Sequence, residues 1–558
     1  MQSPRYVETP PDWEDHEKPA LPGSPARLVH AMPRRIAYIL VGVLVGMVGG
    51  LGNGLVTANL TAIQGQLGLT PVEAAWLPAA YVMVNVTANL LVFKCRQQLG
   101  LRVFAEWGLG IYALLALMHV FVEGYTMSLL VRGVSGFAGA ATSSLAVLYV
   151  MQGMPSSKIP AAFIVGMNLS SLAVPLAWVL SPSLATVNPW PALYAFEAGL
   201  ALCAFAAVVV LKLPKGIQIH VFEWLDFVTF LLVAPAVALL CAVLAQGVNG
   251  WWANTPWLAY ALIASIVLFA LAALLEYSRR TPLIQLRWLL HPSTLAFMVG
   301  ALLMRFMISE QNYGVVGLLR AMCMNPVPLQ PLAGVIFVGL LLGVVVGAAT
   351  FGPAMILPQI LTSVFLICVG GYLDLHSTSL SRPHDFFFSQ FLIAFSAALF
   401  MGPLMMIGIK QALGKGMDHM VTFVVLFSVT QSLGGLAGAA LLGTIQQQRA
   451  RLYVQSIARE MPATDPQVNQ RLNQLQQANS RLITDPSQRA AQSRAQLTQI
   501  VKREAAVLAF NDVFRVIGAM ALGFLGWALY RVLWLRLRAV YAARQAARAV
   551  ALQATPTP

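Results

Sequence analysis

The sequence predicts an all-α membrane protein with fourteen transmembrane helices. Of its 558 residues, 58% are hydrophobic and only 10% are charged, and the mean hydropathy is +0.72. Soluble domains carry about 25% charged residues, so a lipid bilayer must be the solvent for most of this chain. Apolar runs of about 18–25 residues, each long enough to cross a bilayer as a helix, recur along the whole sequence.

Fourteen apolar runs follow one another along the chain. They lie near residues 36–62, 74–93, 103–122, 127–150, 161–180, 192–211, 224–245, 257–275, 295–319, 332–349, 356–373, 386–409, 421–442 and 507–532. Their even number places both ends of the chain on one side of the membrane. Lys and Arg cluster outside both ends and in alternate loops, as at Arg34, Lys94, Lys212, Arg279 and Lys410, except in the loop near residues 351–353, which has none. Cytoplasmic loops are enriched in these residues, so both termini are expected in the cytoplasm.

The net charge of +14 does not indicate a nucleic-acid partner, because the basic residues sit in short clusters between apolar runs. The five cysteines are scattered and show no metal or redox spacing. No Walker motif, metal-ligand set or nucleophile elbow is visible, so we expect neither an enzyme nor a cofactor.

Three segments lie outside the apolar runs. Residues 1–33 are polar and Pro-rich and are expected to form a disordered cytoplasmic tail, and residues 536–558 form a second cytoplasmic tail. Residues 445–505 form a polar insertion, rich in Gln and Arg, on the outer side. Within it, Asp465 and Asp485 each precede a proline, which is typical of an N-cap. We therefore expect two or three helices here, forming either a docking surface or a solvated connector.

Four stretches are similar to one known family. They are TAIQGQLGLTPVEAAWLPAAY at residues 61–81, LAQGVNGWW at 244–252, QSLGGLAGAALLGT at 431–444 and AVLAFNDVF at 506–514. The third is a glycine-rich run of the kind that lets transmembrane helices approach closely. In order and spacing, residues 30–535 resemble the major facilitator superfamily, in its fourteen-span drug–proton antiporter branch (EmrB/QacA type).

The resemblance implies a particular domain organisation. A six-helix half would comprise residues 34–215, and two accessory helices would follow at 216–290. The second half would comprise 291–444 and 506–535, interrupted by the insertion at 445–505. In this family, members with a long helical outer loop work with a periplasmic adaptor and an outer-membrane channel, so the insertion implies both partners.

The loop between the second and third runs departs from the family pattern. In the family, this loop contains an acid followed by basic residues and is thought to switch the conformation. Here residues 93–102 read FKCRQQLGLR, so Gln97 replaces the acid, while Gly100 and Arg102 remain. The resemblance therefore implies a conformational-switch loop at Gln97, Gly100 and Arg102 with an altered charge pattern.

Proton coupling needs a buried group that can gain and lose a proton between two conformations. Charged residues within a span are costly unless paired or hydrated, so each is a functional hypothesis. Glu310 in RFMISEQNY is the strongest candidate for proton coupling, and Arg305, five positions earlier, is a further one. Arg132 matches an arginine that the family ties to coupling, and Glu197 lies in the sixth run. The alternatives are a structural network for Glu310, a helix clamp for Arg132 and an outer-mouth position for Glu197.

Polar and flexible residues within the runs are candidates for a substrate cavity, since such pockets are mostly apolar with a few polar groups. The candidates are Asn53, Thr57, Asn85, Gln311, Asn312, Met304 and Met405. Helix packing is the alternative for each of them.

We therefore predict a proton-coupled secondary exporter of lipophilic or amphiphilic compounds in a bacterial inner membrane, acting as the inner-membrane part of a tripartite efflux pump. Two alternatives stay open. The chain could export a single endogenous metabolite, such as a siderophore or an aromatic secondary product. It could also be a membrane scaffold or sensor that transports nothing.

Overall fold

The computed structural model describes residues 6–8, 11–14, 17–19, 23–122, 124–184, 189–279, 282–324, 326–416, 419–462 and 464–553. In these ranges the chain is almost wholly helical. The α-helices are α1 (Met32–Ala58), α2 (Leu60–Leu67), α3 (Pro71–Leu99), α4 (Leu101–His119), α5 (Tyr125–Gly153), α6 (Ile159–Leu184), α7 (Pro189–Val210), α8 (Trp224–Gln246), α9 (Pro256–Ser278), α10 (Leu286–Leu289), α11 (Pro292–Ser309), α12 (Val316–Ala321), α13 (Pro326–Ala349), α14 (Ile356–Leu373), α15 (Phe387–Leu413), α16 (His419–Arg459), α17 (Pro466–Asn479) and α18 (Pro486–Gln553). A π-helical segment, Glu310–Val315, joins α11 to α12.

The described part of the chain contains 14 helical stretches that are long and apolar enough to cross a membrane. This number confirms the fourteen runs predicted from sequence. Most helices start a few residues before the apolar run does, and some of them are capped by a polar side chain. Thr70, for example, accepts a hydrogen bond from the backbone of Glu73, whose side chain bonds back to Thr70. This capping box begins α3 three residues before the predicted run.

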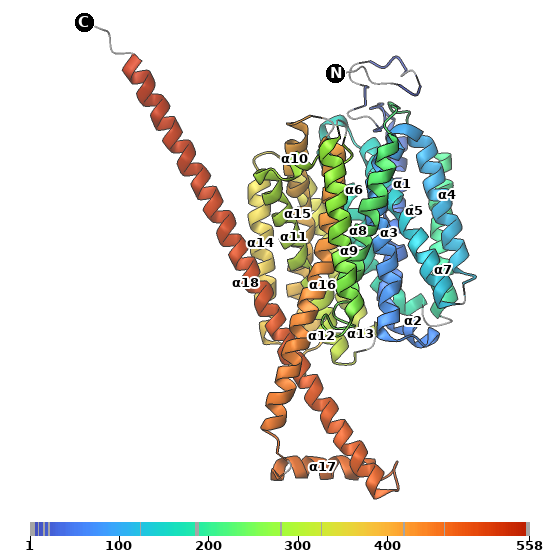
Figure 1. Ribbon diagram of the computed structural model, residues 1–558, viewed down its shortest axis with the longest axis vertical. Coiled ribbons are helices and arrows are strands. Elements are labelled where there is room, and N and C mark those ends of the chain that lie inside the picture. Colours follow the sequence, from blue (N-terminus) through green and yellow to red (C-terminus); the bar gives the residue numbers. More distant parts are fainter. Residues whose placement is uncertain are drawn as a thin grey trace.

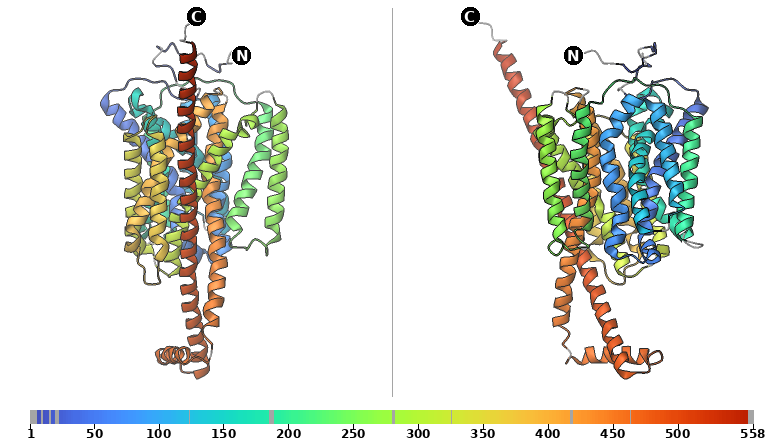
Figure 2. Two further views of the ribbon diagram at one scale, coloured as in Figure 1. Left: turned by 90° about the vertical axis from the view of Figure 1, so that its left-hand side faces the viewer. Right: turned by 45° about the vertical axis from the view of Figure 1, so that its right-hand side comes forward.

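The membrane helices form two groups of six with a helix pair between them in the sequence. The first group contains α1 and α3–α7, and the second contains α11, α13–α16 and α18. The groups meet where α6 packs along α13 and where α3 packs along α16. The intervening helices, α8 and α9, pack on each other, and α8 also contacts α3 and α16. Figure 2 shows this pair on the flank of the bundle.

Gly434 and Gly438, within the glycine-rich stretch of residues 431–444, lie on the face of α16 that packs against α11. A Cβ atom at Gly434 would lie 2.9 Å from Cβ of Arg305, and one at Gly438 would lie 2.4 Å from Oγ of Ser309. Real Cβ atoms do not approach so closely, so glycine is required for this packing. The predicted close approach of the helices is therefore present.

The insertion at 445–505 is helical and projects from the bundle. Figure 1 shows α16 and α18 leaving the bundle side by side, with α17 lying across their far ends. Asp465 and Asp485 cap α17 and α18 by accepting hydrogen bonds from Gln467 and Ser487, as their sequence context predicts. The backbone N–H of Ser487 lowers the pKa of Asp485.

The described N-terminal residues and the C-terminal end of α18 lie at the end of the molecule opposite α17 (Figure 1). Of the predicted N-terminal tail, residues 1–5, 9, 10, 15, 16 and 20–22 lie outside the described residues, as do residues 554–558 of the C-terminal tail. The described residues 23–30 lie against the segment that follows α7. There the N–H of Ala26 donates to the carbonyl of Lys215, and Gln152 donates to the carbonyl of Ala26.

Candidate functional site

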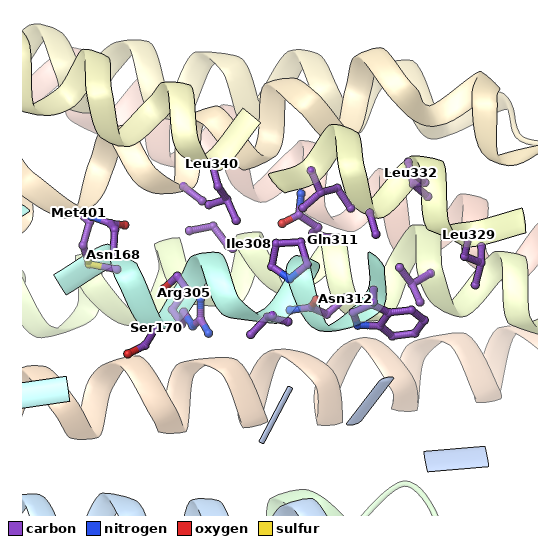
Figure 3. A pocket seen from close by; sticks show the side chains of 18 residues that line it. Asn168, Ser170, Arg305, Ile308, Gln311, Asn312, Leu329, Leu332, Leu340 and Met401 are labelled. Carbon is purple, nitrogen blue, oxygen red and sulfur yellow. The ribbon is translucent and has the colours of Figure 1, made fainter. Parts of the chain in front are cut away.

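A cavity of about 230 Å³ lies where the two six-helix groups meet. Its walls come from α6, α11, the π-helical segment, α12, α13 and α15, and Figure 3 shows it from close by. The lining side chains are mostly apolar, with a few amides and hydroxyls and one charge. They are Asn168, Ser170, Ser171, Val174, Pro175, Trp178, Arg305, Ile308, Gln311, Asn312, Val316, Leu329, Leu332, Ala333, Ile336, Leu340, Ala397 and Met401. This composition is typical of a site for small apolar or amphiphilic molecules.

A second cavity of about 330 Å³ adjoins the first. It is lined by α11, the π-helical segment and α16, together with Val82 of α3. The two cavities share Arg305, Ile308 and Asn312. The side chains of α11 therefore stand between them, and Arg305 faces both.

The structure places only some of the predicted cavity residues there. Gln311 and Asn312 line the first cavity, and Met401, which the predicted site set did not include, lines it too. Met304 and Met405 are instead buried in the hydrophobic core, with 1% and 5% of their surfaces exposed. Their side chains pack the helices and do not reach either cavity.

The predicted polar residues of the first six-helix group bond to neighbouring helices or to their own helix. Asn53 accepts a hydrogen bond from Arg132 at 2.7 Å, and Asn85 donates to the carbonyl of Gly136 at 3.0 Å. Thr57 donates to backbone carbonyls one turn earlier in α1. None of the three lines either cavity, and each bonds a neighbouring helix or its own helix.

Glu310 is fully buried and lies beside a second carboxyl group that the sequence did not reveal. Nε2 of Gln390 lies 3.2 and 3.3 Å from the two carboxyl oxygens of Glu310 and 3.1 Å from Oδ2 of Asp374. The two carboxyl groups are close enough to interact electrostatically. Asp374 follows the predicted run 356–373 and there resembles an ordinary acid at a helix end. Only the folded chain shows that it is 2% exposed.

Glu310 begins the π-helical segment but points away from the cavities. Glu310 lines neither cavity, whereas the next two residues, Gln311 and Asn312, face the first one. Nε2 of Gln311 donates to the backbone carbonyl of Gln390 at 3.2 Å. Gln311, which lines the cavity, is therefore hydrogen-bonded to Gln390, and the side-chain amide of Gln390 bonds both carboxyl groups. Such π-helical segments occur frequently at functional sites.

Arg132 is the centre of a polar cluster in the first six-helix group. Its side chain is fully buried, with Nη1 donating to the carbonyl of Gly52 at 2.9 Å and Nη2 to Asn53 at 2.7 Å. The guanidinium also lies over the ring of Tyr81, 4.9 Å from its centroid. The carboxyl group of Glu197 is close enough to interact electrostatically with it. Arg132 and Glu197, both predicted as coupling residues, are thus brought together.

Gly52 makes room for the acid of this cluster. A Cβ at Gly52 would lie 2.2 Å from the hydroxyl of Tyr112 and 2.5 Å from Oε1 of Glu197. Tyr112 donates to Glu197 at 3.1 Å. His119, which the sequence did not single out, is fully buried nearby and stacks on Tyr194 with ring centroids 4.7 Å apart.

The predicted switch loop joins α3 to α4. Gly100 has φ of 81°, a conformation that favours glycine. The carbonyl of Gln97 accepts a hydrogen bond from the N–H of Ile219, and Nε of Arg102 donates to the carbonyl of Leu213 at 2.9 Å. The loop therefore holds the segment that connects α7 to α8.

An acid from α8 pairs with the basic end of α3. Nζ of Lys94 lies 2.5 Å from Oδ2 of Asp226, and Arg279 bonds both Asp226 at 2.9 Å and Glu276 at 2.7 Å. The helix pair α8–α9 thus supplies a carboxylate beside the loop in which Gln97 stands where the family pattern has an acid. Within the described ranges, no group of three or more His, Cys, Asp or Glu residues could hold a metal ion.

No protein-family model matches the sequence, and no curated protein matches it. Solved structures match the fold. The human organic anion transporter MFSD10 (TETRAN) is 13% identical, with a TM-score of 0.51 over 88% of this chain and 100% of that chain. A bacterial homologue of the human drug peptide transporters PepT1 and PepT2 is 12% identical, with a TM-score of 0.53 over 90% and 99%. A bacterial homologue of the human lysosomal transporter Spinster is 13% identical, with a TM-score of 0.50 over 89% and 98%.

These likenesses confirm the predicted fold. The chain is an all-α, multi-pass membrane protein with the major facilitator fold and 14 candidate membrane-spanning helices in its described part. Identities of 12–13% show the fold alone, so the drug–proton antiporter branch stays a prediction.

Proposed function

We propose that this protein is a proton-coupled secondary exporter of lipophilic or amphiphilic compounds. Its fold is shared with transporters of organic anions and with a homologue of drug peptide transporters, so the fold supports transport without selecting a substrate. The cavities lie between the two six-helix groups, which is where alternating access would expose a substrate first to one side and then to the other. Their largely apolar lining favours lipophilic cargo.

The carboxyl pair beside the cavity carries the proposal of proton coupling. Two interacting carboxylates in a buried site repel each other, so the Glu310–Asp374 pair is most stable with a shared proton. Gln390 bonds both acids, and Gln311 joins Gln390 to the cavity. A substrate that moves Gln311 would therefore shift Gln390 and alter the hydrogen bonds that hold the proton. In the proposed cycle, the pair takes up a proton from the outer side and releases it inside as the two halves rock.

Proton movement in proteoliposomes tests the coupling. With a pH-sensitive dye inside, the wild type is expected to move protons when a lipophilic substrate is added. Glu310→Gln and Asp374→Asn should lose this response, because neither amide can release a proton. Glu106→Gln is the matched control, since Glu106 is a partly exposed acid of α4 that pairs with Lys212. A silent wild type, or a full response in Glu310→Gln, would contradict the proposal.

We further propose that the protein works in a bacterial inner membrane, with both termini in the cytoplasm, as part of a tripartite pump. The projecting hairpin of α16, α17 and α18 supports this assembly, because it is a long helical surface on the side opposite the chain ends (Figure 1). Its proposed partners are a periplasmic adaptor and, through the adaptor, an outer-membrane channel.

A shortened hairpin tests the assembly. Arg449 and Tyr453 of α16 bond Asp512 of α18 at 2.6 and 2.8 Å, so these contacts must be kept. Replacing residues 457–506 by a short Gly-Ser linker keeps them and removes α17. We expect cells to lose export across the whole envelope, while the purified variant still moves protons in proteoliposomes. Unchanged export from cells would refute the docking role of the hairpin.

A further inference from the structure

Arg305 is the one charged side chain that lines the cavities between the two halves. It comes from α11 and lies at the boundary of both cavities, where Figure 3 shows it near Ser170, Ile308 and Asn312. In the described part of the chain, every other residue lining either cavity is apolar or uncharged. Any substrate that occupies either cavity therefore meets a single positive charge and no negative one.

The guanidinium of Arg305 is only partly used by the protein. Its Nε donates to the backbone carbonyl of Gln431 at 3.2 Å. An arginine has five N–H donors, and among the described residues no other acceptor and no carboxylate pairs with this one. Arg279 is a contrasting case, because it bonds Glu276 and Asp226. The remaining donors of Arg305 are thus available to a ligand.

The packing of α16 holds Arg305 in this position. A Cβ at Gly434 would lie 2.9 Å from Cβ of Arg305, and one at Gly435 would lie 3.4 Å from its Nε. The arginine stem therefore lies flat against the two glycines. Gly435 also lines the second cavity, so the arginine stem lies along the wall of that cavity.

An unpaired charge in a membrane span is costly, and an anion from a ligand would remove that cost. Guanidinium binds planar anionic groups through paired, charge-assisted hydrogen bonds. Asn312 and Gln311 add neutral polar groups, and Ile308 and Leu332 add apolar wall. A drug-sized ligand needs about 300–1,000 Å³, so the second cavity alone reaches the lower end of that range.

We propose that Arg305 binds the anionic group of an amphiphilic substrate, such as a carboxylate or sulfonate, whose apolar body fills the cavities. This inference rests on the proposed function and narrows it from lipophilic compounds in general to amphiphilic anions. Cationic amphiphiles are disfavoured, because they would approach Arg305 with no acid in either cavity to compensate.

Binding of a matched probe set to the purified full-length protein in non-ionic detergent tests this inference. The probes are dansylaminoundecanoic acid, its primary amide and the corresponding amine, followed by dansyl fluorescence. The wild type is expected to bind the carboxylate at least about tenfold more tightly than the amide, because charge-assisted hydrogen bonds are stronger than neutral ones. The amine should bind most weakly.

Arg305→Gln should reduce the preference for carboxylate over amide to within about twofold, with little change in the affinity for the amide, because only the charge is removed. Arg305→Lys should keep part of the preference. Lys410→Gln, which removes an exposed charge from the end of α15, is the matched control and should keep all of it. A wild type without the preference, or Arg305→Gln with the full preference, would overturn the inference. The wild-type comparison stands even if Arg305→Gln fails to fold.

Binding separates this inference from the proposed function. A protein that prefers the carboxylate but moves no protons in proteoliposomes would contradict proton coupling and support the anion site. A protein that moves protons with the carboxylate and the amide equally, and binds both equally, would contradict the anion site alone.

Discussion

Two arginines within membrane spans, one in each half, have opposite surroundings. Arg132 is fully buried and bonds the carbonyl of Gly52 and the side chain of Asn53. Arg305 makes one bond, to the carbonyl of Gln431, and otherwise faces the cavities. Both arginines lie within apolar runs, so the hydropathy of the sequence around them does not distinguish them. The free-energy cost of placing an arginine in a membrane span can therefore be offset by partners within the protein, as for Arg132. For Arg305, a bound ligand would offset it.

The acids follow the same division. In the first half, Glu197 lies within electrostatic reach of Arg132, so the charges are compensated locally. In the second half, Glu310 and Asp374 share Gln390, and neither lines the cavity that Arg305 lines. The first half therefore resembles a structural clamp. In the second half, Arg305 does not pair with Glu310 or Asp374. Such an arrangement suits a substrate site at Arg305 that is coupled to a proton site at the two acids.

Removing each arginine should give the largest contrast in stability. Arg132→Leu leaves the carbonyl of Gly52, Asn53 and the acid Glu197 without their partner, and such losses cost roughly 3–5 kcal/mol. Arg305→Leu loses one hydrogen bond, about 0.5–1.5 kcal/mol, and removes an unpaired charge, so its net effect should be small. Thermal unfolding of the purified variants in one detergent, followed by tryptophan fluorescence, gives the comparison. Equal losses would show that Arg305 is as structural as Arg132.

Filling the space at Gly52 should produce the next largest effect. Gly52→Ala would place a methyl group 2.2 Å from the hydroxyl of Tyr112 and 2.5 Å from Glu197, forcing both to move. Overpacking of this kind costs about 1–3 kcal/mol. Gly334→Ala is the control, because a Cβ there meets nothing within 4 Å. An equal fall in the unfolding temperatures of Gly52→Ala and Gly334→Ala would show that the tight packing around Glu197 does not contribute to the stability of this half.

The sequence predicts the fold and the buried charges well, because both follow from the bilayer. Apolar runs must form helices that satisfy their own backbone groups, so their number can be counted directly. A charge within a run must find a polar environment, which is why Arg132 and Glu310 could be selected without a structure. Neither argument requires knowledge of which helices touch.

The partners of these charges could not be predicted, because they depend on tertiary contacts. Asp374 lies 64 positions from Glu310 by residue number, and Gln390, which bonds both, lies on a third helix. Asn53 and Asn85 are polar residues in apolar runs, like Gln311 and Asn312, yet only the latter pair lines a cavity. The difference lies in the direction of each side chain, which hydropathy and spacing do not specify.

The smallest predicted effect distinguishes two adjacent glycines of α16. Gly434→Ala would bring a methyl group 2.9 Å from Cβ of Arg305, whereas Gly435→Ala would bring one 3.4 Å from its Nε, an ordinary contact. The first should cost about 1 kcal/mol or more through overpacking. The second should be neutral to slightly stabilising, by at most about 0.8–1.0 kcal/mol, because alanine is better in a helix than glycine by about that amount.

Chemical unfolding in mild denaturant, together with binding of the anionic dansyl probe, would measure both effects. Gly434→Ala should also weaken binding of the carboxylate while leaving that of the amide unchanged, because it displaces the arginine stem from α16. If Gly434→Ala left both stability and binding unchanged, the glycine face of α16 would not set the position of Arg305. The contrast between the two arginines would then have to arise from α11 alone.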